Sequence, residues 1–318
     1  MSVAHVSSDL LVAGPSKSRD FPSVPIVDSH VHLYPPEANR DPAAWAAERG
    51  EVHWATLCTR QRKDGRPVQG FSNVAGLLRA MDAAGIGRAI LLGWYWEKPE
   101  TAAEQNRFYA ACIREHPDRL SACATVHPNA GRGPALDAVR RAHEAGFVGL
   151  GELSPHSQHH AIDDPTFAEV LALAGELKMP VNLHVTDPES RPFPGRIETP
   201  LEDFAALARR FPTTTFILAH WGGVLPLRDP TARELGNVVY DTAASPLLYG
   251  PEIWRRFVET VGAERVLFGS DFPLNLYPRL ELEAELVRLV AEAKTSGLPT
   301  GSLNGIFERN AVRVFGLA

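Results

Sequence analysis

Residues 27–32 read VDSHVH and lie in a short apolar run that follows a proline. The valines around the polar positions favour a strand. Side chains two positions apart on a strand point to the same face, so His30 and His32 face the same way. Two imidazoles on one face can share a metal ion. The stretch therefore predicts a first strand over 25–31 that carries a candidate metal-binding pair, although an HxH pair alone is equally typical of a structural feature.

Seven further apolar runs follow, separated by segments in which apolar residues recur about every 3.6 residues. The expected strands are 88–93, 120–126, 147–152, 180–186, 215–220, 237–241 and 265–270. The expected helical segments are 72–84, 101–115, 134–145, 165–178, 200–210, 250–261 and 281–293. Near-continuous apolar strands that alternate with helices indicate a parallel sheet with a covered outer face. The chain is therefore predicted to be an α/β protein, a (β/α)8 TIM barrel.

We expect one barrel domain over 25–318, preceded by an N-terminal arm over 1–24 that mixes Ser, Gly, Pro and Lys. One connection, 34–71, is longer than a usual loop between a strand and a helix. Because it follows the first strand, it would lie at the catalytic face of the barrel. We interpret it as a lid-like insertion, with a surface excursion packed by its own tryptophans as the alternative.

Composition excludes several classes of protein. With 44% hydrophobic and 22% charged residues, the chain can bury a large core and is too apolar to be disordered. The net charge of −6 gives no positive field for nucleic acid or anionic lipid, and we expect neither partner. The three cysteines form no CxxC pair, which favours a reducing compartment. Without a signal-peptide pattern or an apolar stretch of about 18 residues, a cytoplasmic protein is expected.

Ligand-type side chains stand at the ends of further predicted strands. Glu152 ends the fourth strand and His184 the fifth. His220 ends the sixth strand, and Asp271 follows the eighth. Barrel enzymes place their reacting groups at these carboxyl-terminal ends. A charged group among apolar residues costs on the order of several kcal/mol unless a metal or a partner compensates. The set therefore predicts a metal site, with a satisfied polar group in the core as the alternative for each residue singly.

This ordered set resembles that of the amidohydrolase superfamily. The phrases VDSHVHL, LHV, LAHWGG and LFGSDFP, with the closing NAVRVFGL, resemble its amidohydrolase-related branch. That branch includes aminocarboxymuconate semialdehyde decarboxylase and the pyrone dicarboxylate lactonases. The resemblance covers residues 25–318 and is specific for the superfamily, but not for a substrate.

The resemblance implies a role for each matching position. His30, His32 and His184 would ligate a divalent metal ion. Asp271 would touch the metal or its water and also move a proton. His220 would polarise the substrate or orient the attacking water. We therefore expect Asp271 and His220 to be the catalytic residues.

Glu152 leaves the number of metal ions open. Some relatives have a carboxylated lysine or a glutamate there that bridges two metals, whereas the decarboxylase-like relatives use one metal and need no ligand on that strand. Three imidazoles with one or two carboxylates are donors of borderline hardness, which favours Zn²⁺, with Mn²⁺ and Fe²⁺ as alternatives. One or two ions, zinc first, are expected.

The chemistry of such a site predicts a metal-dependent hydrolase of a small amide, ester or lactone. Bound zinc brings the pKa of water from about 15.7 to about 7. Asp271 could then accept the proton as hydroxide attacks a carbonyl, while His220 or the metal stabilises the oxyanion. The alternative is a metal-dependent decarboxylase of an unsaturated or aromatic carboxylic acid, in which no water attacks. A third hypothesis is a binding or scaffold protein without chemistry, but the intact ligand set argues against it.

Several residues near the predicted rim are candidate substrate contacts. Trp94 and Trp96 follow the second predicted strand, and His127 ends the third. The alternative for the tryptophans is a buried aromatic cluster. Asp241, after the seventh strand, is expected either to bind substrate or to brace the rim. The basic cluster at 60–66 indicates an anionic group on a small-molecule substrate, or else surface charge.

Two further features carry weaker expectations. The histidine-rich run at 154–160 is interpreted as a solvated loop rather than a second ion site. A homodimer is expected only by analogy with relatives.

Overall fold

The computed structural model describes residues 25–318, so the predicted arm over 1–24 lies outside the described residues. Eight parallel strands form one sheet in the order β1 to β8. Their bounds are β1 Ile26–Val31, β2 Ile86–Leu92, β3 Leu120–Ala124, β4 Gly149–Leu153, β5 Val181–Leu183, β6 Phe216–Leu218, β7 Val238–Asp241 and β8 Val266–Leu267. The two ends of the sheet meet, because the backbone N–H of Ser29 donates to the carbonyl of Phe268 at 2.8 Å. The predicted (β/α)8 TIM barrel is confirmed.

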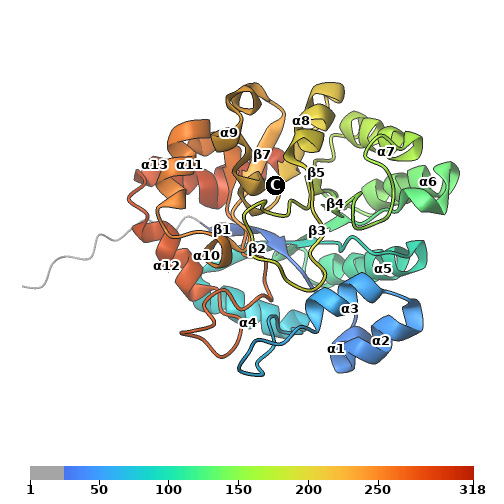
Figure 1. Cartoon of the computed structure of the whole chain (residues 1–318), viewed down its shortest axis with the longest axis horizontal. Helices are drawn as coiled ribbons and strands as arrows, with labels where there is room; N and C mark the ends of the chain where they lie inside the picture. Colours follow the sequence, from blue (N-terminus) through green and yellow to red (C-terminus); the bar gives the residue numbers. More distant parts are fainter. Residues whose placement is uncertain (1–24) are drawn as a thin grey trace, which may run out of the picture.

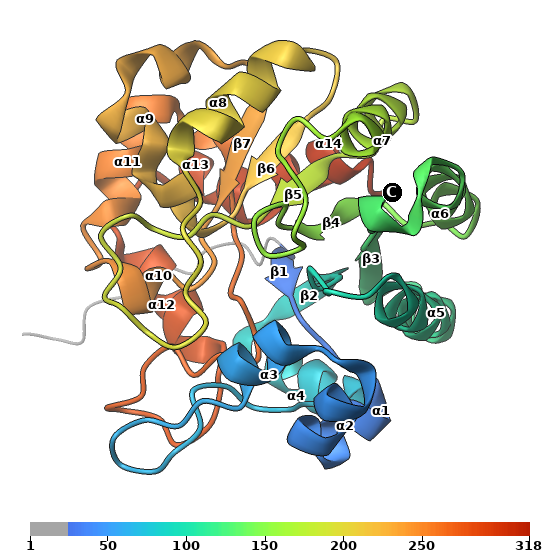
Figure 2. The same cartoon turned by 45° about the vertical axis from the view of Figure 1, so that its right-hand side comes forward.

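Helices surround the strands, as Figures 1 and 2 show. The longer ones are α4 Val74–Ala84, α5 Pro99–Glu115, α6 Arg132–Glu144, α7 Pro165–Glu176, α8 Leu201–Arg210, α11 Ile253–Val261 and α12 Val287–Thr295. The shorter ones outside the insertion are α9 Leu225–Arg228, α10 Ser245–Leu248, α13 Thr300–Asn304 and α14 Asn310–Phe315. Local chemistry sets their ends. Asp164 caps α7 by accepting from the backbone N–H of Phe167 at 2.9 Å, and Gly85 ends α4 in the left-handed conformation.

Several strands end earlier than the sequence predicted. β5 stops at Leu183 and β6 at Leu218, so His184 and His220 lie just past the strands rather than within them. After β6 the backbone enters a left-handed turn with positive φ from His220 to Val224. Strand pairing cannot continue through such a turn, because strand backbones have negative φ. The result is a rim of polar side chains at the carboxyl ends of the strands.

The insertion over 34–71 forms three short helices, α1 Pro36–Arg40, α2 Pro42–Arg49 and α3 Val52–Cys58, and then an irregular connection to α4. Its two tryptophans, Trp45 and Trp54, are buried, with ring centroids 5.2 Å apart. This packing is typical of an excursion held by its own tryptophans, and movement as a lid stays a prediction.

Two other sequence features can be examined in the described residues. The cysteines Cys58, Cys112 and Cys123 are buried and unpaired. Between residues 25 and 318, every helix falls short of the length and apolarity required to cross a bilayer.

Candidate metal centre and active site

Two imidazoles from β1 and the residue after it lie side by side at the rim. The Nε2 atoms of His30 and His32 are 3.1 Å apart, and both residues are buried. Nδ1 of His30 lies 2.9 Å from Oδ2 of Asp241, and Nδ1 of His32 lies 3.1 Å from the carbonyl oxygen of Leu92. A carbonyl only accepts, so His32 carries its proton on Nδ1, and the Asp241 carboxylate favours the same tautomer in His30. Both Nε2 atoms are therefore available as ligands at the same point.

The electrostatics of this pair favour one positive charge between the two rings. Burial opposes the charged form of His30, but the carboxylates around it, Asp241 first, outweigh burial and raise its pKa to about 10. Burial and the neighbouring His30 charge lower the pKa of His32 to about 3. The site thus stabilises one positive charge at the two Nε2 atoms and disfavours a second, and a metal ion bound there would take the place of the His30 proton.

Glu152 joins the two halves of the site. Its Oε2 lies 3.6 Å from Nε2 of His32. Its Oε1 lies 2.9 Å from Nδ1 of His184 and 3.5 Å from Nε2 of His220. Burial opposes ionisation of Glu152, but the histidines around it, led by His184, hold its pKa well below the usual range. A charged carboxylate therefore bridges the β1 pair and the histidines that follow β5 and β6.

Asp271 faces the same point from the segment that follows β8. Its Oδ1 lies 3.5 Å from Nε2 of His32, and its Oδ2 lies 3.8 Å from Nδ1 of His220. Burial raises the pKa of Asp271 to about 7, against the opposing effect of nearby histidines. This carboxyl can therefore hold or release a proton near neutral pH.

A left-handed turn positions His220. His220 and Trp221 have φ of 58° and 57°, and the two glycines that follow continue the turn. A Cβ on Gly222 would lie 2.7 Å from a ring carbon of Tyr240, and one on Gly223 would lie 2.9 Å from a methyl carbon of Leu201. The HWGG sequence thus provides glycine where both the backbone angle and the packing exclude a side chain.

His32, Glu152, His184, His220 and Asp271 line one cavity of about 760 Å³ at the carboxyl ends of the strands. Aromatic residues after β2 form one wall. The ring of Trp94 lies 5.3 Å from that of His32, and the ring of Tyr95 lies 4.9 Å from that of His184. This volume suits a small organic substrate.

The connection between β5 and α8 covers another side of the cavity and meets the insertion. Nε2 of His53 lies 2.8 Å from the carbonyl oxygen of Gly195. The guanidinium of Arg60 lies 4.5 Å from the centroid of the Phe193 ring. These contacts join the two segments over the mouth of the cavity.

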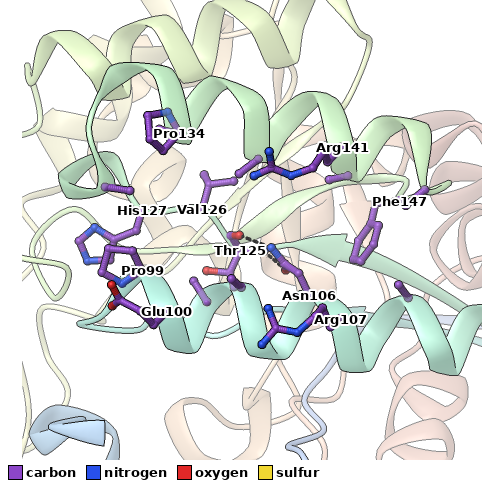
Figure 3. Close-up of a pocket in the computed structure, with 18 residues that line it drawn as sticks. Pro99, Glu100, Asn106, Arg107, Thr125, Val126, His127, Pro134, Arg141 and Phe147 are labelled. Atoms are coloured by element: carbon purple, nitrogen blue, oxygen red, sulfur yellow. Dashed lines mark hydrogen bonds between the residues drawn. The ribbon is translucent and has the colours of Figure 1, made fainter.

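Two predicted substrate contacts lie elsewhere. Trp96 is fully buried beside Trp45 and Trp54, and its Nε1 donates to Oε1 of Gln105 at 2.6 Å, so it belongs to the aromatic cluster given as the alternative. His127 lines a separate groove on the outside of the barrel (Figure 3) rather than the catalytic cavity. Both residues follow strands at the rim, but the side chains of both lie outside the catalytic cavity.

Sequence reasoning missed most of the cavity wall supplied by the connection over 184–200. Phe193 and Asp187 line the cavity, and Tyr249, from the connection after β7, donates to the Asp187 carboxylate. The signal was present, because the run DPESRPFPGR is long and rich in proline and charge for a strand-to-helix loop.

The donor set fits a divalent metal ion. His30, His32 and Glu152 form one group whose ligand atoms lie within 4.8 Å of one another, and Glu152, His184 and His220 form a second such group. Imidazole nitrogens and carboxylate oxygens are suitable ligands for divalent transition metals. The histidine-rich run at 154–160 contributes to neither group.

The comparisons with known proteins agree with this site. The family model described as amidohydrolase matches residues 27–317. Because the match covers nearly the whole chain, the protein belongs to the amidohydrolase family, and the resemblance seen in its sequence is confirmed. It is an enzyme of the amidohydrolase superfamily.

Solved structures with the same fold include three decarboxylases of aromatic acids. The 2,6-dihydroxybenzoate decarboxylase from Rhizobium has a TM-score of 0.65 and 19% identity, over 92% of this chain and 99% of its own. The 5-carboxyvanillate decarboxylase from Sphingomonas paucimobilis has a TM-score of 0.68 and 17% identity, over 93% and 100%. A dihydroxybenzoic acid decarboxylase from Polaromonas sp. JS666, solved with manganese and 2-nitroresorcinol, has a TM-score of 0.65 and 18% identity, over 92% and 97%.

These structures overturn the predicted hydrolase. Each is named as a decarboxylase, which was the alternative activity, and none of the three is named as a hydrolase. The prediction failed because one ligand set can serve both reactions, so the residues that bind a metal do not distinguish attack by water from loss of carbon dioxide.

Proposed function

We propose that this member of the amidohydrolase family is a divalent-metal-dependent decarboxylase of an aromatic or unsaturated carboxylic acid. Asp271 carries the proposal, because it is a buried carboxyl at the ligand cluster, it lines the cavity, and its pKa is raised to about 7. Decarboxylation needs such a group, since the carbon that loses carbon dioxide must gain a proton. The similarity in fold to the aromatic acid decarboxylases supports the same reaction.

The proposed metal ligands are His30, His32, His184, Glu152 and Asp271. A bound divalent ion supplies Lewis acidity, which holds a substrate oxygen and stabilises the negative charge that develops on the substrate. We propose Zn²⁺ or Mn²⁺ as that ion, because imidazole and carboxylate donors of this kind accept both. Whether the site would hold one ion or two depends on whether Glu152 would bind two ions at once.

The chain's own residues would position the substrate and move the proton. Trp94 and Tyr95 would pack against the unsaturated part of the substrate, since both line the cavity. The bond between the substrate carbon and its carboxylate breaks, and the electron pair stays on that carbon. The carbon then takes the proton from the Asp271 carboxyl, and solvent returns a proton to Asp271. His220, whose Nδ1 lies 3.8 Å from Oδ2 of Asp271, would orient the substrate beside that proton donor.

Arg60 is the residue we propose for binding an anionic group on the substrate. It is half-buried, it lines the cavity, and its pKa is lowered by burial. Among the other basic residues of the 60–66 cluster, Arg66 pairs with Asp64, and Arg62 donates to the carbonyl of Asn275. Arg60 makes no ion pair with any other residue between 25 and 318, so a substrate anion would provide its missing partner.

The expectations about partners and location stay predictions. A homodimer rests on analogy alone, and a cytoplasmic location rests on cysteine usage. The absence of nucleic-acid and membrane partners is expected from the net charge of −6 and the composition.

A direct test is to incubate the purified, metal-loaded enzyme in D₂O with 2,6-dihydroxybenzoate and 5-carboxyvanillate. We expect carbon dioxide and a product that carries deuterium at the carbon that bore the carboxylate. Asp271→Asn protein is the matched control and should release little carbon dioxide. A panel of aromatic and unsaturated acids that releases none with metal-loaded wild-type enzyme would contradict the proposed reaction.

A further inference from the structure

Two tyrosines line the catalytic cavity, and their hydroxyls have different surroundings. The hydroxyl of Tyr249 donates to the Asp187 carboxylate. Tyr95 is only 2% exposed, yet its hydroxyl makes no hydrogen bond with any residue between 25 and 318. The oxygen is not sealed off by protein atoms either, so it opens into the cavity that Tyr95 lines. The cavity therefore contains a buried phenol whose donor is free for a bound molecule.

Aromatic neighbours from three segments fix the direction of this hydroxyl. The Tyr95 ring stacks on that of Trp94, with the centroids 4.4 Å apart and the planes at 28°. It lies 4.9 Å from the ring of His184, which follows β5, and 5.8 Å from the ring of His53 in α3. A side chain that is already held in place loses little further freedom when a ligand binds. Tyr95 is therefore a preorganised donor.

The Tyr95 side chain lies beside the proposed metal ligands. It packs against His184, whose Nδ1 lies 2.9 Å from Oε1 of Glu152. Burial raises the pKa of Tyr95 above its ordinary value, and the Glu152 and Asp271 carboxylates are close enough to raise it further. The phenol thus keeps its proton at neutral pH, although it donates to neither carboxylate. Because buried donors normally have an acceptor, the missing one is expected on a molecule bound in the cavity.

We propose that Tyr95 is a further catalytic residue, whose hydroxyl donates a hydrogen bond to a substrate oxygen conjugated with the reacting carbon. This inference rests on the decarboxylation proposed above. When carbon dioxide leaves, the electron pair stays on that carbon and is shared with the conjugated oxygen. A hydrogen bond to this oxygen strengthens as negative charge develops on it, so it favours the transition state over the bound substrate. Tyr95 keeps its own proton, and Asp271 supplies the proton that the carbon gains.

This role of Tyr95 narrows the class of substrate. The acid needs a hydroxyl or carbonyl oxygen on its unsaturated system, in addition to the carboxylate that it loses. An acid without that oxygen leaves the buried Tyr95 donor unpaired, and sites built around a hydrogen bond discriminate strongly against molecules that cannot form it. Tyr95 is therefore also a specificity-determining residue.

The test is Tyr95→Phe in the Mn²⁺-loaded full-length protein, because this change removes the hydroxyl and keeps the ring. Titration calorimetry uses two probes: 2-nitroresorcinol, which has conjugated hydroxyls and no carboxylate to lose, and benzoate, which has no oxygen beyond its carboxylate. Tyr95→Phe should bind 2-nitroresorcinol about 5- to 10-fold more weakly than wild type, and benzoate about equally well. Tyr240→Phe is the matched control and should bind both as wild type does, since the Tyr240 hydroxyl is buried away from the cavity and has no partner among the described residues.

Kinetics give a second measurement. With an oxygen-bearing acid that wild type decarboxylates, Tyr95→Phe should lower kcat about 100-fold, a larger factor than the rise in KM, and leave the metal content unchanged. If wild type binds neither probe and decarboxylates no acid, the proposed function is wrong and this inference fails with it. The inference alone is wrong if wild type is active but Tyr95→Phe has the same kcat, or if the variant loses affinity for both probes equally.

Discussion

Asp241 holds one imidazole of the metal centre, with its Oδ2 2.9 Å from Nδ1 of His30. The same oxygen accepts from Nδ2 of Asn182 at 3.1 Å, and Oδ1 accepts from the backbone N–H of His220 at 3.0 Å. One buried carboxylate therefore fixes the tautomer of His30 and the start of the turn that carries His220. The sequence left Asp241 as either a substrate contact or a brace, and its contacts are those of a brace.

The first prediction concerns this brace. Asp241→Asn should lower metal affinity about 10- to 100-fold, because the partner of a metal-binding imidazole fixes its orientation and basicity. Metal retained after dialysis against a weak chelator, measured by elemental analysis, checks this. Asp163→Asn, at an exposed position, is the control and should retain wild-type metal content. Equal metal content in both variants would show that Asp241 does not contribute to metal binding.

The second prediction concerns proton transfer. Asp271→Asn should lower kcat by about 100-fold or more, since an amide cannot deliver the proton and such transfer contributes about that much. The variant should keep its fold, because the amide is nearly isosteric with the carboxyl. Steady-state measurement of kcat tests this, and circular dichroism verifies that the variant is folded. A folded variant whose rate falls by only a few fold would show that another group supplies the proton.

The third prediction is the pH dependence that follows from Asp271. Burial raises its pKa to about 7, so its protonated form, the proposed donor, is present below that pH and is lost above it. A divalent cation beside this carboxyl favours its ionised form, so kcat should decline as the pH rises with a midpoint at or below about 7, and the loss should approach tenfold per pH unit well above it. Rates measured across this range in buffers of constant ionic strength check it. A rate that rises through neutral pH would mean that the ionised carboxylate is the active form.

The fourth prediction concerns the turn after β6. Gly222→Ala should destabilise the protein by about 1 to 3 kcal/mol, because its Cβ would lie 2.7 Å from Tyr240 and its φ is 58°. Urea unfolding measures the change. Gly236→Ala is the matched control, since a Cβ there meets nothing within 4 Å. Equal stability of the two variants would show that the turn relaxes without strain.

The fifth prediction concerns substrate charge. Arg60→Gln should raise KM for an acid with a second anionic group about 10- to 100-fold, as expected for loss of a charge-assisted hydrogen bond. KM for an acid without that group should change little. Lys63→Gln, at an exposed position in the same cluster, is the control. If both acids lose affinity equally in Arg60→Gln, the guanidinium acts on the shape of the cavity rather than on the second charge.

The barrel could be predicted because its signals are local. Apolar runs alternate with helical segments along the chain, and the spacing of apolar residues within each segment distinguishes a strand from a helix. The ends of the strands were harder to place. β5 and β6 end before His184 and His220, because these residues make contacts with distant parts of the chain that no local pattern predicts. The site could be predicted to the same extent, since parallel strands bring their carboxyl ends to one rim.

The sequence by itself determined the fold and the residue types at the rim, including His30, His32, Glu152 and Asp271. Only the tertiary structure decided that Trp96 and His127 face away from the cavity and that Asp241 braces His30. It also decided that the connection over 184–200 forms a wall of the cavity. The physical reason is that periodicity fixes which face of a strand a residue occupies, whereas side-chain partners come from loops distant in sequence. Their packing depends on the whole chain, and no local pattern records it.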